Sequence, residues 1–401
     1  MSIYKAKYYE AFHYFNYERR KKSMLSVRIP PLDEEAMRKA RERQERLTKP
    51  KGSLGFLEEI SVLIAGMTAN ERPRIEKKLV LTLAADHGVA EEGVSAYPRE
   101  VTAQMVRNFL RGGAAINVLA RHVGARHVVV DVGVAEDVHA DADVAVNFVV
   151  KKVAYGTRNF LKGPAMSREQ AERAVKAGME VLEEEFERSN GLDIVAVGDM
   201  GIANTTASSA VVAALTGAEP EYVTGRGTGI SEERLRRKVE VVKQGIERNK
   251  PFEDALDVLA KVGGFEIGGI AGVILAAAAR RVPVVIDGFI ASAGALLAYK
   301  LNPHARNYML AGHLSAERGH AFVLKHLNLR PILQLDMRLG EGTGAALAIS
   351  IVEAACKILD EMATFEEAGV SEKVLKRFEK GRHAAFAFER LAEAHEGRSA
   401  L

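Results

Sequence analysis

The chain has 401 residues, of which 47% are hydrophobic and 27% are charged, so it can bury a large core and is not disordered as a whole. Its single cysteine excludes a disulfide framework, and its longest apolar run, residues 267–279, is shorter than the roughly 20 residues that span a bilayer. The net charge is +3, but residues 1–23 hold six Lys and Arg against two Glu, so the rest of the chain gives no electrostatic sign of nucleic-acid binding. We therefore expect a cytoplasmic protein that binds neither membrane nor nucleic acid.

The first 23 residues differ from the rest of the chain, because they also hold five of its ten tyrosines. We expect Met24 to be the true start and residues 1–23 to be a non-native or disordered extension. At the gene level, residues 18–20 (Glu-Arg-Arg) can be encoded by a ribosome-binding sequence at a suitable distance before Met24. The competing interpretation is a genuine extension whose aromatic and basic side chains dock on the rest of the protein or on a partner chain.

Short apolar runs rich in Val, Leu and Ile, without strict alternation, predict strands that are buried on both faces and hence a mainly parallel sheet. These runs are residues 78–88, 127–135, 193–201, 282–289, 307–313 and 331–340. Helical patterns lie between them, for example at 168–188 and 231–247, and a further helical pattern at 344–362 follows the last run. This alternation favours a doubly wound α/β fold with helices on both faces of the sheet.

The two ends of the chain, residues 32–72 and 344–396, also read as helical and could pack together beside the sheet. We therefore predict an α/β domain over residues 76–343, and a small helical domain that residues 24–75 begin and residues 344–401 complete. Cys356 lies within an apolar helical run, so we expect it in the core rather than in a reactive site.

Four of the predicted strands end with an acid near glycine: Asp86, Asp199, Asp287 and Asp336. Ligands of open α/β sheets bind beyond the carboxyl ends of the strands, so these side chains are candidates for one site. Taken singly, each is also explained as the N-cap of the next helix. The four together, among glycine-rich loops, favour a site.

Three glycine-rich loops could bind a phosphate group, because free amides and hydroxyls at a helix start bind anions. Their candidate contacts are Gly201, Asn204 and Thr205 in the first loop, Gly225 and Gly227 in the second, and Ser315 in the third, with Lys238 as a nearby cation. Each loop alone is equally well explained as a tight turn with an N-cap. None has the spacing of a P-loop or of a dinucleotide-binding motif.

Residues 84–106 offer a place for a flat aromatic ligand after the first predicted strand. Tyr97 could wall the ring, while Ser95, Gln104 and Asp86 could bind its polar edge. His87 could ligate a metal, but the 11 histidines show no metal-binding spacing, so we expect no metal and no cofactor.

Glu341 is a single acid between Gly340 and Gly342, at the joint between a predicted strand and a predicted helix. Such an acid can act as a general base, and burial would make it a better one by raising its pKa. Its alternative is a first-turn Glu that the helix dipole stabilises.

Five motifs that occur in this order closely resemble the nicotinate-nucleotide–dimethylbenzimidazole phosphoribosyltransferase family over residues 31–370. They are TKPKGSLG (48–55), ADHGVAEEGVSAYP (85–98), GDMGIANTT (198–206), GRGTG (225–229) and MRLGEGTGAAL (337–347). The resemblance implies transfer of the ribose phosphate of nicotinate mononucleotide onto 5,6-dimethylbenzimidazole, which gives α-ribazole 5′-phosphate and nicotinate in cobalamin nucleotide-loop assembly. It further implies a metal-independent homodimer with a Rossmann-like domain and a small helical domain.

The resemblance also implies roles for single residues. Glu341 matches the family's proton acceptor, and the glycines beside it would let a flat base approach the backbone. The family loop commonly reads G-E-M-G, whereas this chain has GDMG, so Asp199 carries its carboxyl one methylene further back. That difference bears on the contact that Asp199 makes with the ribose or the base.

Two other functions fit parts of the pattern. One is a phosphoribosyltransferase that uses a diphosphate sugar, which a requirement for magnesium would reveal; the single acid of residues 284–294 argues against it. The other is a protein that binds the nucleotide or its product without turnover, against which Glu341 and Lys238 argue.

Overall fold

The computed structural model describes residue 25, residues 27–140 and residues 147–371. Its centre is a seven-stranded sheet in the order β3-β2-β1-β4-β5-β6-β7, and each pair of neighbouring strands is parallel. The strands are β1 (Lys78–Ala85), β2 (Arg126–Gly133), β3 (Phe148–Val150), β4 (Ile194–Met200), β5 (Val284–Ile286), β6 (Met309–His313) and β7 (Pro331–Leu333). The predicted α/β fold with a mainly parallel sheet is confirmed.

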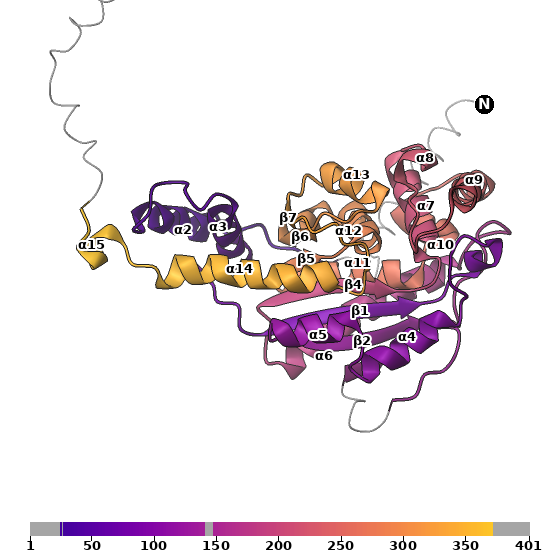
Figure 1. Cartoon of the computed structure of the whole chain (residues 1–401), viewed down its shortest axis with the longest axis horizontal. Helices are drawn as coiled ribbons and strands as arrows, with labels where there is room; N and C mark the ends of the chain where they lie inside the picture. The colour runs from indigo at the N-terminus through magenta and orange to yellow at the C-terminus, as the bar shows by residue number, and fades with distance from the viewer. Residues whose placement is uncertain (1–24, 26, 141–146, 372–401) are drawn as a thin grey trace, which may run out of the picture.

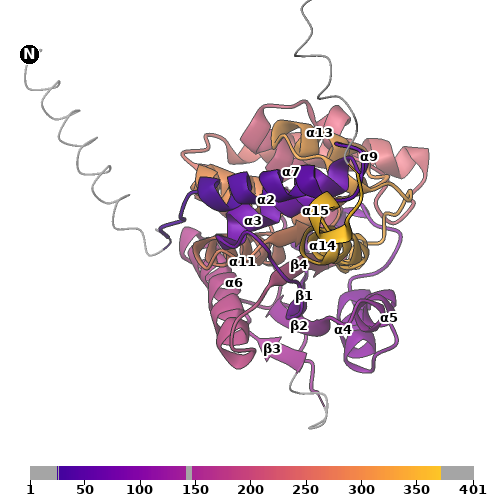
Figure 2. The same cartoon turned by 90° about the vertical axis from the view of Figure 1, so that its left-hand side faces the viewer.

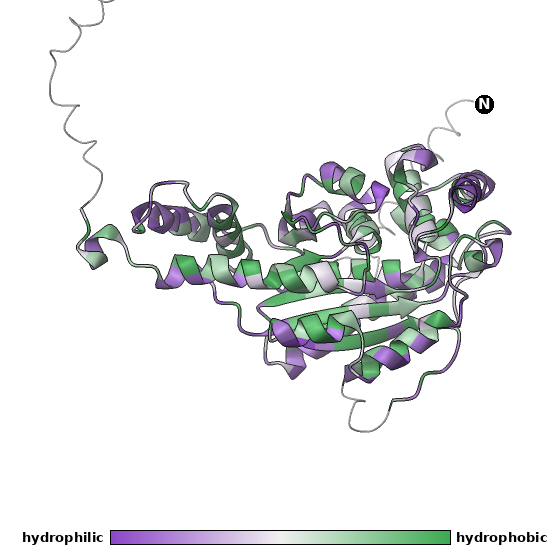
Figure 3. Cartoon of the chain, viewed as in Figure 1, coloured by the Kyte–Doolittle hydropathy of each residue, from purple (hydrophilic) through white to green (hydrophobic). Residues whose placement is uncertain are grey.

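The central strand β1 shows why the apolar runs lack alternation. It pairs with β2 on one side and with β4 on the other, so Leu81 lies between Val128 and Val197. From Leu79 to Ala85 each residue of β1 is buried, and Figure 3 shows the strands as a hydrophobic layer at the centre of the molecule. A strand that is covered on both faces gains burial free energy from side chains on each face, at about 25 cal/mol per Å² of apolar area.

Helices cover both faces of this sheet (Figure 1). One face carries α4 (Val101–Leu110), α5 (Ala115–His122) and α14 (Thr343–Glu361), and the other carries α6 (Arg168–Arg188), α11 (Phe265–Ala279) and α12 (Phe289–Leu301). Small residues let α6 and α11 pack closely: a Cβ on Gly178 would lie 1.8 Å from the carbonyl oxygen of Gly269.

Shorter elements connect these layers. The helices α7 (Asn204–Thr216), α8 (Pro220–Val223) and α9 (Glu232–Asn249) pack on one another, and α7 also contacts α12. The remaining bounds are η1 (Gly88–Glu92), α10 (Ala255–Val262), η3 (Pro303–Tyr308) and α13 (Arg318–His326).

The first and last helices of the described residues meet in a group beside the sheet (Figure 2). It consists of α2 (Glu34–Arg46), α3 (Phe56–Thr68), the last turns of α14 and α15 (Phe365–Ala368). Its own small core contains Ala40, Val62, Ala65 and Leu359. The side chain of Arg43 donates hydrogen bonds to the carbonyl groups of residues 359, 360 and 362, which fastens α2 to the end of α14. This packing agrees with a small helical unit, and the predicted domain boundaries remain a prediction.

Three predicted elements differ in extent from those observed. The run at 331–340 forms a strand only over residues 331–333, because Asp336 takes a left-handed backbone angle (φ +54°) and the chain leaves the sheet. The strand at 282–289 is likewise reduced to residues 284–286. The segment 344–396, predicted to be helical, is interrupted after Glu361, where residues 363 and 364 pair with residues 47 and 48; the short helix α15 follows, and residues 372–396 lie outside the described part of the chain.

Two predictions fall on residues that are not described. The expected extension, residues 1–23, lies outside the described part of the chain, and so do residues 372–401. Among the described residues, no helix is both long enough and apolar enough to cross a membrane.

Candidate active site

A cavity of about 550 Å³ opens beyond the carboxyl ends of β1, β4, β5 and β6. Its volume is in the range of small-molecule sites, and its position is where open α/β sheets bind ligands. The predicted site residues that line it are Ser95, Tyr97, Asp199, Gly201, Asn204, Thr205, Gly227, Ser315, Gly340 and Glu341. Ten residues from five separate loops thus meet at one cavity, as the sequence motifs suggested.

Glu341 occupies an unusual turn at the cavity wall. Residues 340, 341 and 342 all have left-handed backbone angles (φ +84°, +67° and +98°), which costs a residue with a side chain roughly 1–2 kcal/mol. Its N–H donates to the carbonyl oxygen of Asp199 (3.1 Å), and its own carbonyl oxygen accepts from the hydroxyl of Thr82 (2.7 Å). Gly198 leaves room for the turn, since a Cβ there would lie 2.1 Å from the nitrogen of Gly342. The main chain of Glu341 is therefore fixed from both β1 and β4.

The carboxyl group of Glu341 is almost enclosed, with the residue 5% exposed. Burial raises its pKa from 4.5 to about 7, and the negative charge of Asp287 adds to this shift, while the N–H of Ile116 opposes it with a long hydrogen bond of 3.4 Å. A carboxyl group with this pKa is half ionised near neutral pH. It can therefore accept a proton in one step of a reaction and release it in another.

Asp199 presents a second carboxyl group to the same cavity. One of its oxygens accepts from the side-chain amide of Asn204 (2.8 Å), and the other has no hydrogen-bond partner among the described residues. Burial raises the pKa of Asp199 well above its ordinary value, and the nearby carboxylates Asp287, Glu266 and Glu341 raise it further. The raised pKa favours the protonated form of Asp199, which can donate one hydrogen bond to a ligand.

Another part of the cavity wall is suited to an anion. Ser315 and Thr205 line it, and the helix α7 begins there at Asn204, which puts the positive end of the helix dipole at this wall. Lys238 lies directly behind this wall, fully buried, and donates to the hydroxyl of Thr205 (2.8 Å) and to the carbonyl of Gly225 (3.0 Å). Burial lowers the pKa of Lys238 to about 8, and the charge of Glu317 opposes that shift.

Some predicted residues are not brought to the cavity wall. Gly225, Lys238 and Gly342 lie behind it, and Gln104 is exposed on α4 without lining it. Asp336 is exposed at the surface. The four strand-end acids thus do not converge as a group.

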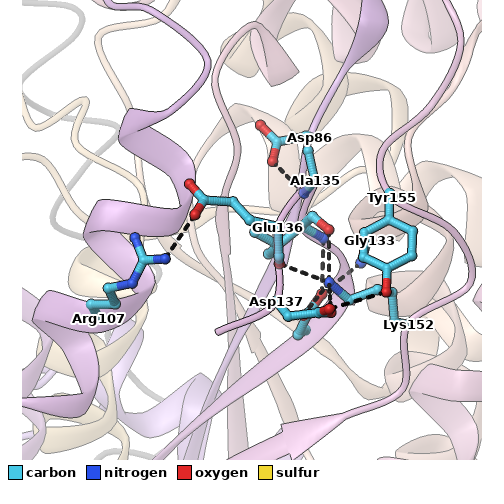
Figure 4. Close-up of polar contacts among 10 residues, drawn as sticks. Asp86, Arg107, Gly133, Ala135, Glu136, Asp137, Lys152 and Tyr155 are labelled. Atoms are coloured by element: carbon cyan, nitrogen blue, oxygen red, sulfur yellow. Dashed lines mark hydrogen bonds and ion pairs between the residues drawn. The ribbon is translucent and has the colours of Figure 1, made fainter. Parts of the chain in front are cut away.

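Asp86 is buried away from the cavity, in a network at the ends of β1 and β2 (Figure 4). Its carboxylate accepts from the N–H of Ala135 (2.7 Å) and lies 3.6 Å from the guanidinium of Arg99. Lys152 binds the neighbouring loop through Asp137 and stacks on the ring of Tyr155. Asp86 therefore joins two strand ends in this structure.

Sequence reasoning missed several residues of the cavity. Arg338 and Glu317 line it, although both lie within stretches that were singled out for other residues. Thr228 also lines it and accepts from the N–H of Ala96 (3.0 Å), which joins two loops at the cavity mouth. All three residues lie within the glycine-rich stretches of the sequence. The sequence beside a glycine turn does not indicate, however, in which direction a side chain points.

His87 pairs with Glu266 in the interior, 2.8 Å apart, and both are fully buried. Within residues 27–140 and 147–371, no group of three or more His, Cys, Asp or Glu side chains could hold a metal ion. Cys356 is buried as predicted, and burial raises the pKa of its thiol to about 12.

Comparison with known proteins gives this geometry a context. A family model described as a phosphoribosyltransferase matches residues 29–370. Proteins named nicotinate-nucleotide–dimethylbenzimidazole phosphoribosyltransferase are similar to this chain: that of Chloroflexus aurantiacus is 62% identical over 347 residues (86% of this chain, 97% of the relative), and that of Desulforudis audaxviator is 59% identical over 346 residues (86% and 96%). A crystal structure of the Thermus thermophilus protein with this name is 47% identical, with a TM-score of 0.80, and the match covers 85% of this chain and 100% of that one. The chain therefore belongs to the nicotinate-nucleotide–dimethylbenzimidazole phosphoribosyltransferase family.

Proposed function

We propose that the chain transfers the ribose 5-phosphate of nicotinate mononucleotide to 5,6-dimethylbenzimidazole and so makes α-ribazole 5′-phosphate and nicotinate for cobalamin assembly. The observation that carries the assignment of a catalytic group is Glu341, an acid with a pKa of about 7 on the wall of a ligand-sized cavity. Family membership supplies the substrates, and the residues around the cavity supply the roles that follow.

The nucleotide's phosphate would bind at the anion side of the cavity. Ser315 and Thr205 offer hydroxyl donors, the start of α7 adds the positive end of its dipole, and Lys238 adds its positive charge from behind. Arg338 stands at the edge of the same cavity and donates to the carbonyl of Gly227 (3.1 Å). Binding of the phosphate here would direct the ribose C1′ toward Glu341.

The base would lie between the loop that carries Tyr97 and the turn at Gly340, where a flat ring can approach the backbone. One ring nitrogen attacks C1′ with its lone pair, and the bond from C1′ to the pyridinium nitrogen breaks, returning its electrons to the leaving nicotinate. The proton on the other ring nitrogen goes to Glu341. Positive charge that develops on the ribose would be stabilised by the carboxylates around the cavity.

Asp199 would act through its carboxyl group, whose raised pKa favours the protonated form. Its unpartnered oxygen is suited to donate to a ribose hydroxyl or to an acceptor on the base, and the shorter side chain leaves more room than a Glu would.

A homodimer, a cytoplasmic location and the two-domain division at residues 75–76 and 343–344 are further parts of the proposal, which the family resemblance supports.

The test measures nicotinate release from nicotinate mononucleotide with a panel of benzimidazoles, purines and phenols, in the presence of a chelator. We expect release that depends on the acceptor, and we expect Glu341→Gln to keep nucleotide binding while losing about 10²–10⁴-fold in turnover. Turnover only with a diphosphate sugar and magnesium would establish the rival transferase. Tight binding of nucleotide and base without release would establish a binding protein.

A further inference from the structure

Asp287 lies immediately after β5, beneath the cavity and fully buried, and it is not part of the cavity wall. Its two carboxylate oxygens accept hydrogen bonds from two amides of one helix start. One bond comes from the N–H of Gly342 (3.1 Å) and the other from the N–H of Ala345 (3.0 Å). A single carboxylate thus satisfies two of the free amides at the start of α14, directly after Glu341.

The helix α14 depends on this contact, because its own N-cap position is Gly342 and supplies no side-chain hydrogen bond. The surrounding space is also filled. A Cβ on Gly344 would lie 2.2 Å from the ring of His313, and a Cβ on Gly312 would lie 2.8 Å from the Cα of Ala345. The first turn of α14 is therefore seated against the ends of β5 and β6, and Asp287 fixes it there.

We propose that Asp287 is a positioning residue for Glu341: by holding the first turn of α14, and by placing a carboxylate behind that turn, it sets the position and the electrostatic surroundings of the Glu341 carboxyl group. The proposal rests on the proposed role of Glu341 as the base. Asp287 is not part of the cavity wall, so it would act on the reaction through residues that are, of which Glu341 follows most directly from the turn it holds.

The negative charge of Asp287 should change the pKa of Glu341 in a direction that can be measured. It faces Glu341 and Asp199 on the cavity side, His313 on β6 (3.5 Å) and His320 on α13. Burial lowers the pKa of His320 to about 3, so this ring is neutral and does not cancel the charge. A negative Asp287 therefore raises the pKa of Glu341, and its removal should lower that pKa.

Asp287→Asn is the direct test, because it keeps the shape, removes the charge and can accept only one of the two N–H groups. We expect turnover to fall by about 10- to 10²-fold, with the KM for nicotinate mononucleotide changed by less than about threefold. The acidic limb of the pH–rate profile should move to lower pH. A residue with a merely structural role would not shift that limb.

Asp131→Asn is the matched control. Asp131 is also a buried carboxylate that accepts from two backbone N–H groups, those of Gly133 (3.0 Å) and Val134 (2.8 Å), but it lies at the end of β2 and does not line the cavity. Its variant should keep the acidic limb of the wild-type profile. An equal shift of the limb in both variants would overturn the proposal.

Asp287→Glu keeps the charge and displaces the carboxylate by one methylene, so it should lower turnover while leaving the acidic limb in place. If Asp287→Asn does not fold, Asp287→Glu tests the positioning role instead. Wild-type turnover in Asp287→Glu would then overturn the proposal. Glu341→Gln is measured in the same assay. If it turns over normally, the base assignment fails; if it is inactive while Asp287→Asn behaves as wild type, only the positioning role fails.

Discussion

The main-chain N–H of Glu341 donates to the main-chain carbonyl of Asp199 across 3.1 Å, so two of the carboxyl-bearing residues that line the cavity are joined directly through their backbones. Both residues line the same cavity, and the pKa values of their carboxyl groups are raised by partly different neighbours. Burial raises the pKa of Glu341 to about 7, and burial together with three neighbouring carboxylates raises that of Asp199 well above its ordinary value. These shifts suit Glu341 to accept a proton near neutral pH and Asp199 to donate a hydrogen bond, so two acids of one site could divide two tasks.

The first prediction concerns the pH dependence of turnover. Only ionised Glu341 can accept the proton, and its pKa is about 7. The rate should therefore rise with pH through about 7 and fall about tenfold for each unit below it. A pH–rate profile of nicotinate release checks this. The control is the residual activity of Glu341→Gln, whose pH–rate profile should lack the fall in rate below about pH 7. If that fall is unchanged in the variant, it belongs to another titrating group.

The second prediction concerns stability. Folding raises the pKa of Glu341 from 4.5 to about 7, so the folded state holds this proton more tightly than the unfolded state does. Between these two values the folded state binds more protons, and the free energy of unfolding falls as pH rises. Glu341→Gln removes the buried charge and should raise the melting temperature at about pH 8 by more than at about pH 5. An equal change at both pH values would contradict the linkage.

Much of this site could be predicted from the sequence, because its parts are local. The glycines beside Glu341 and the strand-end position of Asp199 are visible in single motifs, and the family assignment drawn from those motifs is confirmed. The contacts that Asp287 and Thr82 make with the Glu341 turn are different. Each contact joins residues that are far apart in the chain. The sequence around Asp287 does not indicate whether its carboxylate caps the helix that follows it or, as observed, the start of α14.

The misjudged elements have a similar cause. The strand β3 was missed because its three residues are half-buried or exposed and show no long apolar run. The break within the helical segment predicted at 344–396 was missed because periodicity does not reveal that the chain after Glu361 pairs with residue 47. Asp86 was grouped with Asp199 because both end a strand, although its partner is an amide at the end of β2.

The third prediction concerns the phosphate. Lys238 is fully buried and donates to Thr205 at the cavity wall, so its charge should act on an anion bound there. Lys238→Met, which keeps most of the volume, should weaken nicotinate mononucleotide much more than nicotinate riboside, which lacks the phosphate. Binding measured for the two ligands by calorimetry decides this. Equal losses would make Lys238 a structural residue that ties α9 to α7.

The fourth prediction concerns Gly198, which passes directly beneath the Glu341 turn. A Cβ there would lie 2.1 Å from the nitrogen of Gly342 and 2.3 Å from the carbonyl carbon of Glu341, and both are backbone atoms that cannot rotate away. The turn must therefore shift, and with it the carboxyl group of Glu341. Since misplacement by about 1 Å can cost about 10²-fold in rate, Gly198→Ala should lower turnover strongly, as measured by nicotinate release.

The matched change is Gly163→Ala, on a surface loop where an added Cβ meets no described atom within 4 Å. It introduces the same methyl group and the same reduction in backbone freedom, without a collision, so it should leave turnover unchanged. The melting temperature of each variant separates loss of fold from loss of geometry. If Gly198→Ala folds as stably as Gly163→Ala and turns over at the same rate, the turn can move without harm, and Glu341 does not need the fixed position that β4 gives it.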